Sequence, residues 1–353
     1  MDGTLRLPRA ITFEGFRLVF VQGVPQRMNK MLNDEIVGPQ AWVRNQLRPS
    51  DWLVPFPPRA IAEIEAVIKR IDAENDAIED LRPDQFDLPT CIEVMEEVRR
   101  RLLGGGGLAV VDHVPVERFS TREGRAIGWL LACTLGQVVD QKWEGGRIYD
   151  VKDSGKKLGY GVRRSITNLD QPFHTDGGWL WKPPAFVGLF CLESAPSGGM
   201  SRFTSLITAH NTLRRQNPQL LARLYQPFAW DRQSEHPADA ARFAMQPVFE
   251  EENGVLAARY YEDYVHKGQG LADRPLDDTG RAALLALRGI VDDPDHWIEF
   301  RIERGQFQYI NNRQFAHSRT AFEDAHDASR SRHMLRLWNR DEGTPHLEGR
   351  GFT

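Results

Sequence analysis

The spacing of apolar residues predicts helices in the first 140 residues of the chain. Five apolar residues recur at helical spacing and predict a helix over residues 59–81: Ile61, Ile64, Val67, Ile68 and Ile71. A second apolar stripe predicts a helix over residues 90–103. Ser120 or Thr121 is placed to cap a third helix that runs to about Leu135. The apolar run at residues 108–111 predicts a strand between them, so this part reads as mainly helical.

From about Lys142 the pattern changes to short apolar or alternating runs, separated by Gly, Pro and Asp. These runs predict strands at residues 147–151, 165–167, 186–192, 297–302, 307–310 and 334–338. Helical spacing returns twice, at residues 205–225 and 279–291. Many short strands with polar turns predict a closed sandwich or jelly roll, whose mouth can hold a small ligand.

Composition narrows the class of protein. A length of 353 residues suggests one large domain with additions, or two domains. The net charge of −4 and the pI of about 6.2 give no indication of a nucleic-acid partner. No apolar run approaches the ~20 residues that span a membrane, and the start shows no signal peptide. The three cysteines lack C-x-x-C spacing, so we expect reduced thiols in a cytoplasmic protein.

The segment from Phe173 to Gly178 contains a His-x-Asp sequence. If this segment were a strand, His174 and Asp176 would point to the same face and converge. Two such ligands make up most of a 2-His-1-carboxylate iron(II) site. The pair alone is common in a chain with ten histidines, so a third ligand must come from elsewhere. His317, which follows the strand predicted at residues 307–310, is the candidate.

Two arginines follow this candidate. Arg332 and Arg336 are four residues apart, so a strand would place both guanidinium groups on one face, with Met334 between them. An inward-facing Arg is costly unless it meets an anion, and a guanidinium matches a carboxylate with two parallel hydrogen bonds. The chain therefore offers two candidate metal ligands near its middle and a third at His317. The two arginines that could bind a carboxylate follow His317.

This order resembles the iron(II)/2-oxoglutarate dioxygenases of the taurine dioxygenase (TauD/TfdA-like) family. The resemblance covers about residues 92–340 and extends beyond the ligands. Residues 163–165 lead through Asn168 to the His-x-Asp segment, and residues 196–201 look like the family's Gly-Gly-x-Thr/Ser turn. Residues 311–322 look like its distal-histidine segment. Residues 1–90 match nothing in the family.

The resemblance implies roles for individual residues. His174, Asp176 and His317 look like the iron ligands and hence the catalytic centre. Arg332 looks like the residue that pairs with the distal carboxylate of 2-oxoglutarate, assisted by the Ser201 hydroxyl. Arg336 matches a second Arg that touches the cosubstrate or an anionic group on the substrate. Which of the two arginines contacts 2-oxoglutarate and which contacts the substrate stays open.

Two departures from the family pattern stand beside these roles. Ser201 replaces the commoner Thr but keeps a donor, and Met200 replaces an acidic residue often found there, a change for which we have no account. Because the acidic ligand is present, hydroxylation is favoured over halogenation. Five residues are candidates for substrate contact, although core packing or loop capping would equally explain their types: Asn168, Phe173, Trp179, Trp181 and Tyr149.

We therefore expect a mainly β protein with helices: a double-stranded β-helix (jelly roll) over residues 91–353, with a partly helical extension over residues 1–90 and helical inserts.

The expected activity is oxidation, most simply hydroxylation, of a C–H bond in a small molecule. It would use Fe(II), 2-oxoglutarate and O2 and release succinate and CO2. Desaturation, cyclisation or epimerisation with the same cofactors are alternatives. A non-catalytic jelly-roll protein that binds a carboxylate, and a cupin-like zinc or iron hydrolase or isomerase, are alternatives of other classes. The sequence leaves open whether the chain forms a homo-oligomer.

Overall fold

The computed structural model describes residues 30–74, 77–159, 161–325, 327 and 330–349, and near the N-terminus the backbone of three short strands. These strands form an antiparallel sheet of their own: β1 (Thr12–Phe13), β2 (Phe16–Val21) and β3 (Val24–Arg27).

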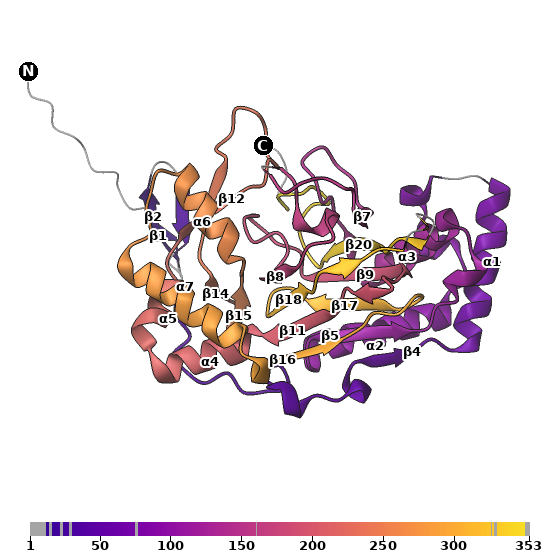
Figure 1. The fold of residues 1–353 in the computed structure, drawn as a ribbon, viewed down its shortest axis with the longest axis horizontal. Helices are drawn as coiled ribbons and strands as arrows, with labels where there is room; N and C mark the ends of the chain where they lie inside the picture. Colours follow the sequence, from indigo (N-terminus) through magenta and orange to yellow (C-terminus); the bar gives the residue numbers. More distant parts are fainter. Residues whose placement is uncertain are drawn as a thin grey trace, which may run out of the picture.

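Two larger sheets form the double-stranded β-helix that the strand pattern and the resemblance predicted (Figure 1). The seven-stranded sheet contains, in spatial order, β4 (Leu53–Pro55), β5 (Leu108–Asp112), β17 (Phe307–Asn311), β9 (Phe186–Glu193), β20 (His333–Arg340) and β6 (Gln137–Val138), with β7 (Tyr149–Val151) also paired to β20. The four-stranded sheet has the order β16 (Trp297–Phe300), β11 (Ser201–Ser205), β18 (Phe315–Arg319) and β8 (Gln171–His174).

Both faces of the seven-stranded sheet are buried, and alternate residues face two different cores. On β5, Leu108 and Val110 pack in the interior core with Phe203 of the second sheet. Ala109 and Val111 point the other way, into a core shared with the N-terminal helices. This explains why the strand reads as an unbroken apolar run, since neither of its faces meets water.

Three helices cover the outer face of this sheet, on the right of Figure 1. They are α1 (Pro58–Glu74), α2 (Pro89–Gly104) and α3 (Thr121–Leu135). Ser120 caps α3 as predicted, with its hydroxyl accepting from the Glu123 N–H. The predicted end of the first helix at residue 81 is wrong, because Ala77 is already extended and Ile78–Asp80 forms a separate 3-10 turn. Residues 53–71 share one core with the sheet, and a domain boundary at residue 90 stays a prediction.

The helical inserts lie at the opposite end of the molecule, on the left of Figure 1. They are α4 (Leu206–Gln216), α5 (Pro218–Leu224), α6 (Glu262–Leu271) and α7 (Asp278–Val291). The single helix predicted over residues 205–225 breaks at Asn217, because Pro218 has no N–H and the Asn217 side chain caps a new helix. The strand predicted at residues 165–167 is also wrong, since Arg164–Ile166 is a 3-10 turn. Helix α6 was not predicted.

Three further pairs of short strands complete the described fold outside the two main sheets. They are β12 (Phe228–Asp231) with β13 (Phe243–Gln246), β14 (Phe249–Glu252) with β15 (Val255–Ala258), and β10 (Ser197–Gly198) with β19 (Phe322–Glu323). Across the part of the chain that the structure describes, none of the helices is both long and apolar enough to cross a membrane.

Helix α6 packs tightly on β12, which makes one of its glycines irreplaceable. A Cβ at Gly268 would collide with the backbone of Ala229 and Trp230, whereas a Cβ at Gly270 would meet nothing within 4 Å. We expect Gly268→Ala to lower the free energy of unfolding by about 3 kcal/mol, because backbone cannot move aside as a side chain can. Gly270→Ala should raise it by up to about 1 kcal/mol through helix propensity. Urea unfolding of both variants checks this, and equal effects would contradict the tight packing.

A buried histidine predicts an acid-sensitive fold. His210 of α4 is fully buried, with Nε2 2.9 Å from the Tyr225 hydroxyl, and burial lowers the pKa of His210 to about 4. Between pH 6.5 and 4 the unfolded chain binds a proton that the folded chain does not, so stability falls as the pH falls through this window. The expected loss is up to about 3 kcal/mol.

Urea unfolding at pH 7, 5.5 and 4 measures this loss. His210→Gln should flatten the pH dependence, while His266→Gln on the exposed face of α6 should leave it as in the parent. Identical slopes in all three proteins would show that His210 is not responsible.

Candidate metal centre

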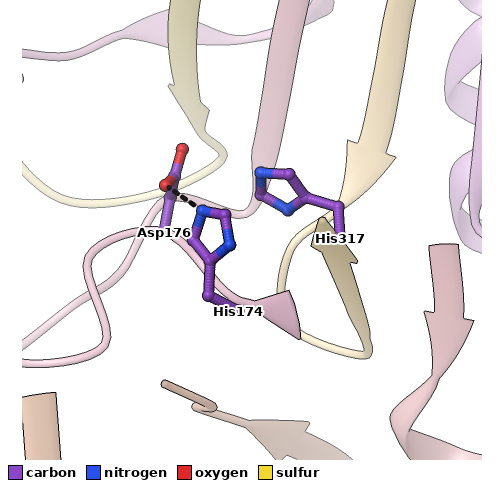
Figure 2. Close-up of side chains that lie close together, drawn as sticks. All are labelled: His174, Asp176 and His317. Atoms are coloured by element: carbon purple, nitrogen blue, oxygen red, sulfur yellow. Dashed lines mark ion pairs between the residues drawn. The ribbon is translucent and has the colours of Figure 1, made fainter. Parts of the chain in front are cut away.

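Two histidines and one aspartate converge inside the double-stranded β-helix. His174 ends β8 and His317 lies opposite it in β18, with ring centroids 4.2 Å apart. Nitrogen atoms of both rings and a carboxylate oxygen of Asp176 all lie within 4.8 Å of one another, and the three residues are buried. Figure 2 shows His174 between the other two side chains. The structure thus brings together the three residues that the sequence singled out, in a space that one metal ion could occupy.

Asp176 reaches this position in a different way from the predicted one. Strand β8 stops at His174, and Asp176 lies in the turn that follows, so strand alternation does not orient it. Asn312, after β17, fixes the turn instead. Its Oδ1 accepts from the Asp176 N–H at 2.8 Å, and its Nδ2 donates to the carbonyls of Asp176 and Pro184, both at 3.0 Å. One fully buried amide therefore ties the carboxylate to the hairpin that carries His317.

The two histidine rings have different hydrogen-bond partners. His174 Nδ1 lies 2.9 Å from the Pro172 carbonyl, so Nδ1 carries the hydrogen, and the lone pair on Nε2 faces the Gln171 amide nitrogen at 2.8 Å. His174 Nε2 is 3.5 Å from Asp176 Oδ1. His317 Nδ1 is buried and has no hydrogen-bond partner among the described residues. Burial, aided by the nearby His174, lowers the pKa of His317 to about 3, so the ring is neutral at physiological pH.

The carboxylate is ionised although it is buried. Burial by itself would raise the pKa of Asp176, but the Arg336 guanidinium lowers it well below its usual range. Arg336 Nη1 lies 3.2 Å from Asp176 Oδ2, and Trp338 Nε1 donates to the same oxygen at 2.9 Å. Trp338 was missed in the sequence, although its spacing from Arg336 on a predicted strand placed it on the same face. The donor set is therefore two imidazoles and one anionic carboxylate, which suits iron(II).

Arg336 lies in β20, whereas Arg332 lies just before its first residue, His333, and the pairing with β9 shifts register between His333 and Met334, so strand alternation does not place the two arginines as the spacing predicted. Arg332 is buried, its Nη2 contacts the Met334 sulfur at 3.1 Å, and its Nη1 has no partner in the described part of the chain. Burial lowers the pKa of Arg332 to about 10, so it stays charged at neutral pH. A charged group that is buried with an open N–H fits an anionic ligand. Ser201 is buried on β11, two residues after Gly199, which packs against the Arg332 side chain.

The five candidates for substrate contact occupy different environments. Trp179 lines the pocket beside His174. Tyr149 lies outside that lining but beneath the Arg336 guanidinium, 4.7 Å from its ring centroid. Phe173 packs in the interior core, while Asn168 and Trp181 are exposed. The structure therefore brings one of the five directly to the pocket.

The pocket beside the metal centre adjoins a larger cavity. The inner pocket is lined by His174 and Asp176, and the outer cavity has a volume of about 550 Å³. Arg164, Tyr261 and Tyr264 belong to both linings. No motif in the sequence marked the two tyrosines, which flank the start of the unpredicted helix α6.

Comparison with known proteins places the chain among oxygenases. A family model described as "Taurine catabolism dioxygenase TauD, TfdA family" matches residues 76–338. The chain is 27% identical over 317 residues to FR-33289 synthase of Streptomyces rubellomurinus, covering 88% of this chain and 92% of that protein.

Two solved structures share the fold. A structure of asparagine oxygenase with Fe(II), 2S,3S-3-hydroxyasparagine and succinate has a TM-score of 0.62 at 17% identity, covering 82% of this chain and 94% of that one. A structure of the non-heme iron oxygenase OrfP with Fe and alpha-ketoglutaric acid has a TM-score of 0.61 at 13% identity, with the same coverage. At these identities the two structures establish a common fold.

Proposed function

This chain belongs to the TauD, TfdA family of taurine catabolism dioxygenases, and from that premise we propose that it hydroxylates a C–H bond of a small molecule with iron(II) and 2-oxoglutarate. The observation that carries the proposal is the buried convergence of His174, Asp176 and His317 within 4.8 Å. The clamp residue Arg332, charged and with an open N–H, is what distinguishes this site from a zinc hydrolase centre.

The residues of the metal centre and those around it have separate roles in this reaction. His174 Nε2, Asp176 and His317 would hold the iron and leave it able to take further ligands. When bound, iron(II) with 2-oxoglutarate and O2 supplies the oxidant for the C–H bond, with succinate and CO2 as coproducts. Asn312 and Trp338 hold the carboxylate in place, and the Pro172 carbonyl holds the His174 ring.

We assign the distal carboxylate of 2-oxoglutarate to Arg332, with the Ser201 hydroxyl as its helper. The buried guanidinium can offer two parallel hydrogen bonds to a planar carboxylate. Arg336 Nη1 forms an ion pair with Asp176, so Nη2 is the nitrogen of this guanidinium that is left to bind a ligand.

Hydroxylation is the preferred outcome for two reasons. The acidic ligand Asp176 is present, and the names of similar structures record hydroxylated amino acids as bound molecules, including (3S)-hydroxy-L-Arg with OrfP. Desaturation, cyclisation and epimerisation use the same cofactors. A product heavier by one oxygen atom, labelled when the reaction is run under 18O2, is the expected result. A product lighter by two hydrogens would instead support desaturation.

One reconstitution tests the cofactor assignment. Iron(II) added without oxygen, followed by 2-oxoglutarate, should give the weak visible charge-transfer band of an iron(II)–2-oxoglutarate complex. Admission of O2 should then convert 2-oxoglutarate to succinate. A carboxylate-binding protein or a zinc hydrolase would give neither signal, and their absence would refute the proposal.

A further inference from the structure

The residue between the two ligands of the His-x-Asp segment makes buried contacts of its own. Thr175 lies just after β8, between His174 and Asp176, and is buried. Its N–H donates to the Tyr260 carbonyl at 2.6 Å, and its hydroxyl oxygen accepts from the Tyr260 N–H at 2.9 Å. Tyr260 is buried as well, so neither bond is open to water. We call this reciprocal pair of hydrogen bonds the Thr175–Tyr260 clasp.

The clasp joins the metal centre to the insert that carries helix α6. Tyr260 follows Thr175 by 85 residues and lies between β15, which ends at Ala258, and α6, which begins at Glu262. Its backbone N–H therefore belongs to neither a strand ladder nor a helix, and a buried N–H needs a partner. The Thr175 hydroxyl is that partner, so its removal would leave a buried donor unpaired.

The residue that follows the clasp packs against a candidate iron ligand. The ring centroid of Tyr261 lies 5.1 Å from that of His174, and the ring centroids of Tyr261 and Tyr264 are 4.1 Å apart. Both tyrosines line the inner pocket and the outer cavity, and we call the pair the tyrosine wall. Because Tyr261 is covalently attached to Tyr260, the clasp fixes where this wall stands relative to His174.

A second attachment of the same insert also ends beside the metal centre. The Ala258 N–H, at the end of β15, donates to the Arg313 carbonyl at 2.7 Å, and the Arg313 guanidinium lies 3.0 Å from Glu250 of β14. Arg313 directly follows Asn312, the amide that holds Asp176. The insert is therefore attached to both of the segments that position Asp176, and Thr175 makes the attachment nearer to the tyrosine wall.

We propose that Thr175 is a positioning residue, which holds the tyrosine wall against His174 and so fixes the boundary between the metal centre and the outer cavity. This inference rests on the proposed function, because it takes the metal centre as the place of reaction. A fixed wall limits the access of water to the reacting groups. Loss of the clasp lets the wall move away from His174, so that 2-oxoglutarate is consumed without a substrate. Succinate, CO2 and water are then the products, and added ascorbate supplies the two electrons that reduce the second oxygen atom to water.

Amide hydrogen exchange on the full chain tests the clasp itself. Thr175→Val replaces the hydroxyl by a methyl group, so peptides that cover residues 259–264 should exchange about tenfold faster, whereas Thr175→Ser keeps the oxygen and should exchange like the parent. Thr208→Val is the matched control, because that hydroxyl donates to the Trp42 carbonyl at 2.8 Å and lines neither the inner pocket nor the outer cavity. If residues 259–264 of Thr175→Val exchange as in the parent, the clasp does not hold the insert and the inference is wrong.

Turnover of 2-oxoglutarate without a substrate tests the consequence for the metal centre. With iron(II), 2-oxoglutarate, ascorbate and O2, Thr175→Val should form succinate at about three times the parent rate or faster, while Thr175→Ser and Thr208→Val should match the parent. Iron content and the charge-transfer band should stay normal, because Asn312 and Pro172 hold the ligands independently of the clasp. An unchanged rate in Thr175→Val, or loss of its band, overturns the inference.

A second variant shows whether Thr175 acts through the wall. Tyr261→Leu keeps the clasp but removes one ring, so it should raise the same rate by itself, and Thr175→Val added to it should raise the rate little further. Two effects that multiply would overturn the inference. If Thr175→Val does not fold, Tyr261→Leu decides alone, because a parent-like rate would show that the wall has no such role. A parent protein with neither the band nor succinate formation overturns the proposed function, whereas the exchange result tests the clasp without iron.

Discussion

His317→Ala should abolish turnover of 2-oxoglutarate and the charge-transfer band while the protein stays folded. His317 is one of three candidate ligands, and the other two cannot replace it because His174 and Asp176 are fixed by Pro172 and Asn312. Loss of a residue that merely supports a ligand costs about 10–100-fold, so loss of a ligand should cost on the order of a thousandfold or more. Metal analysis of the reconstituted protein should show iron bound well below one equivalent.

The fold should survive this change. The His317 Nδ1 has no partner among the described residues, so its removal breaks no hydrogen bond at that atom. Circular dichroism and thermal unfolding check the fold, and His266→Ala, an exposed histidine of α6, serves as the matched control with normal iron content. A His317→Ala protein that kept both the band and the turnover would place the metal centre elsewhere.

Arg332→Met should weaken the binding of 2-oxoglutarate by about 100-fold, which corresponds to about 2.7 kcal/mol. The variant loses two charge-assisted hydrogen bonds to the distal carboxylate but keeps an unbranched chain of similar length. Iron(II) binding without the cosubstrate should not change, because Arg332 lies outside the lining of the metal pocket. Titration of the charge-transfer band with 2-oxoglutarate gives the dissociation constant.

Two companion variants sharpen this measurement. Arg332→Lys keeps the charge but not the planar pair of donors, so its affinity should fall between those of the parent and of Arg332→Met. Arg304→Met removes a half-exposed arginine that lies 3.6 Å from Glu193 at the surface, and should leave the affinity unchanged. If Arg332→Met binds 2-oxoglutarate like the parent, the clamp assignment is wrong and Arg336 becomes the candidate. Thermal unfolding should show no loss in Arg332→Met, since the change also removes a buried charge that has an open N–H.

Much of the architecture could be predicted from local patterns. The period of apolar residues identified helices α2, α3 and α7 within one or two residues of their ends, and it predicted strands β9 and β17. The errors arose where one residue decides the local conformation, as Pro218 does between α4 and α5. Helix α6 was not predicted because it has no clear apolar stripe. Its position is set by packing against β12 through Gly268.

The sequence by itself determined which three residues are the candidate metal ligands. Residues two apart on one strand share a face, so the spacing of Arg336 and Trp338 within β20 places both on the side of Asp176. The identity of His174, Asp176 and His317 as the candidate donors likewise followed from residue type, order and family resemblance. These features depend on chain geometry over a few residues or on motifs, and both are visible in a linear sequence.

Only the tertiary structure decided how those groups meet. Asp176 lies beyond its strand and owes its position to Asn312, 136 residues away, and to Trp338, 162 residues away. The lining of the inner pocket likewise combines residues of a 3-10 turn, of the turn after β8, and of β20. Contacts at such separations depend on the packing of sheets and inserts against one another. No local pattern of hydrophobic and polar residues encodes that packing.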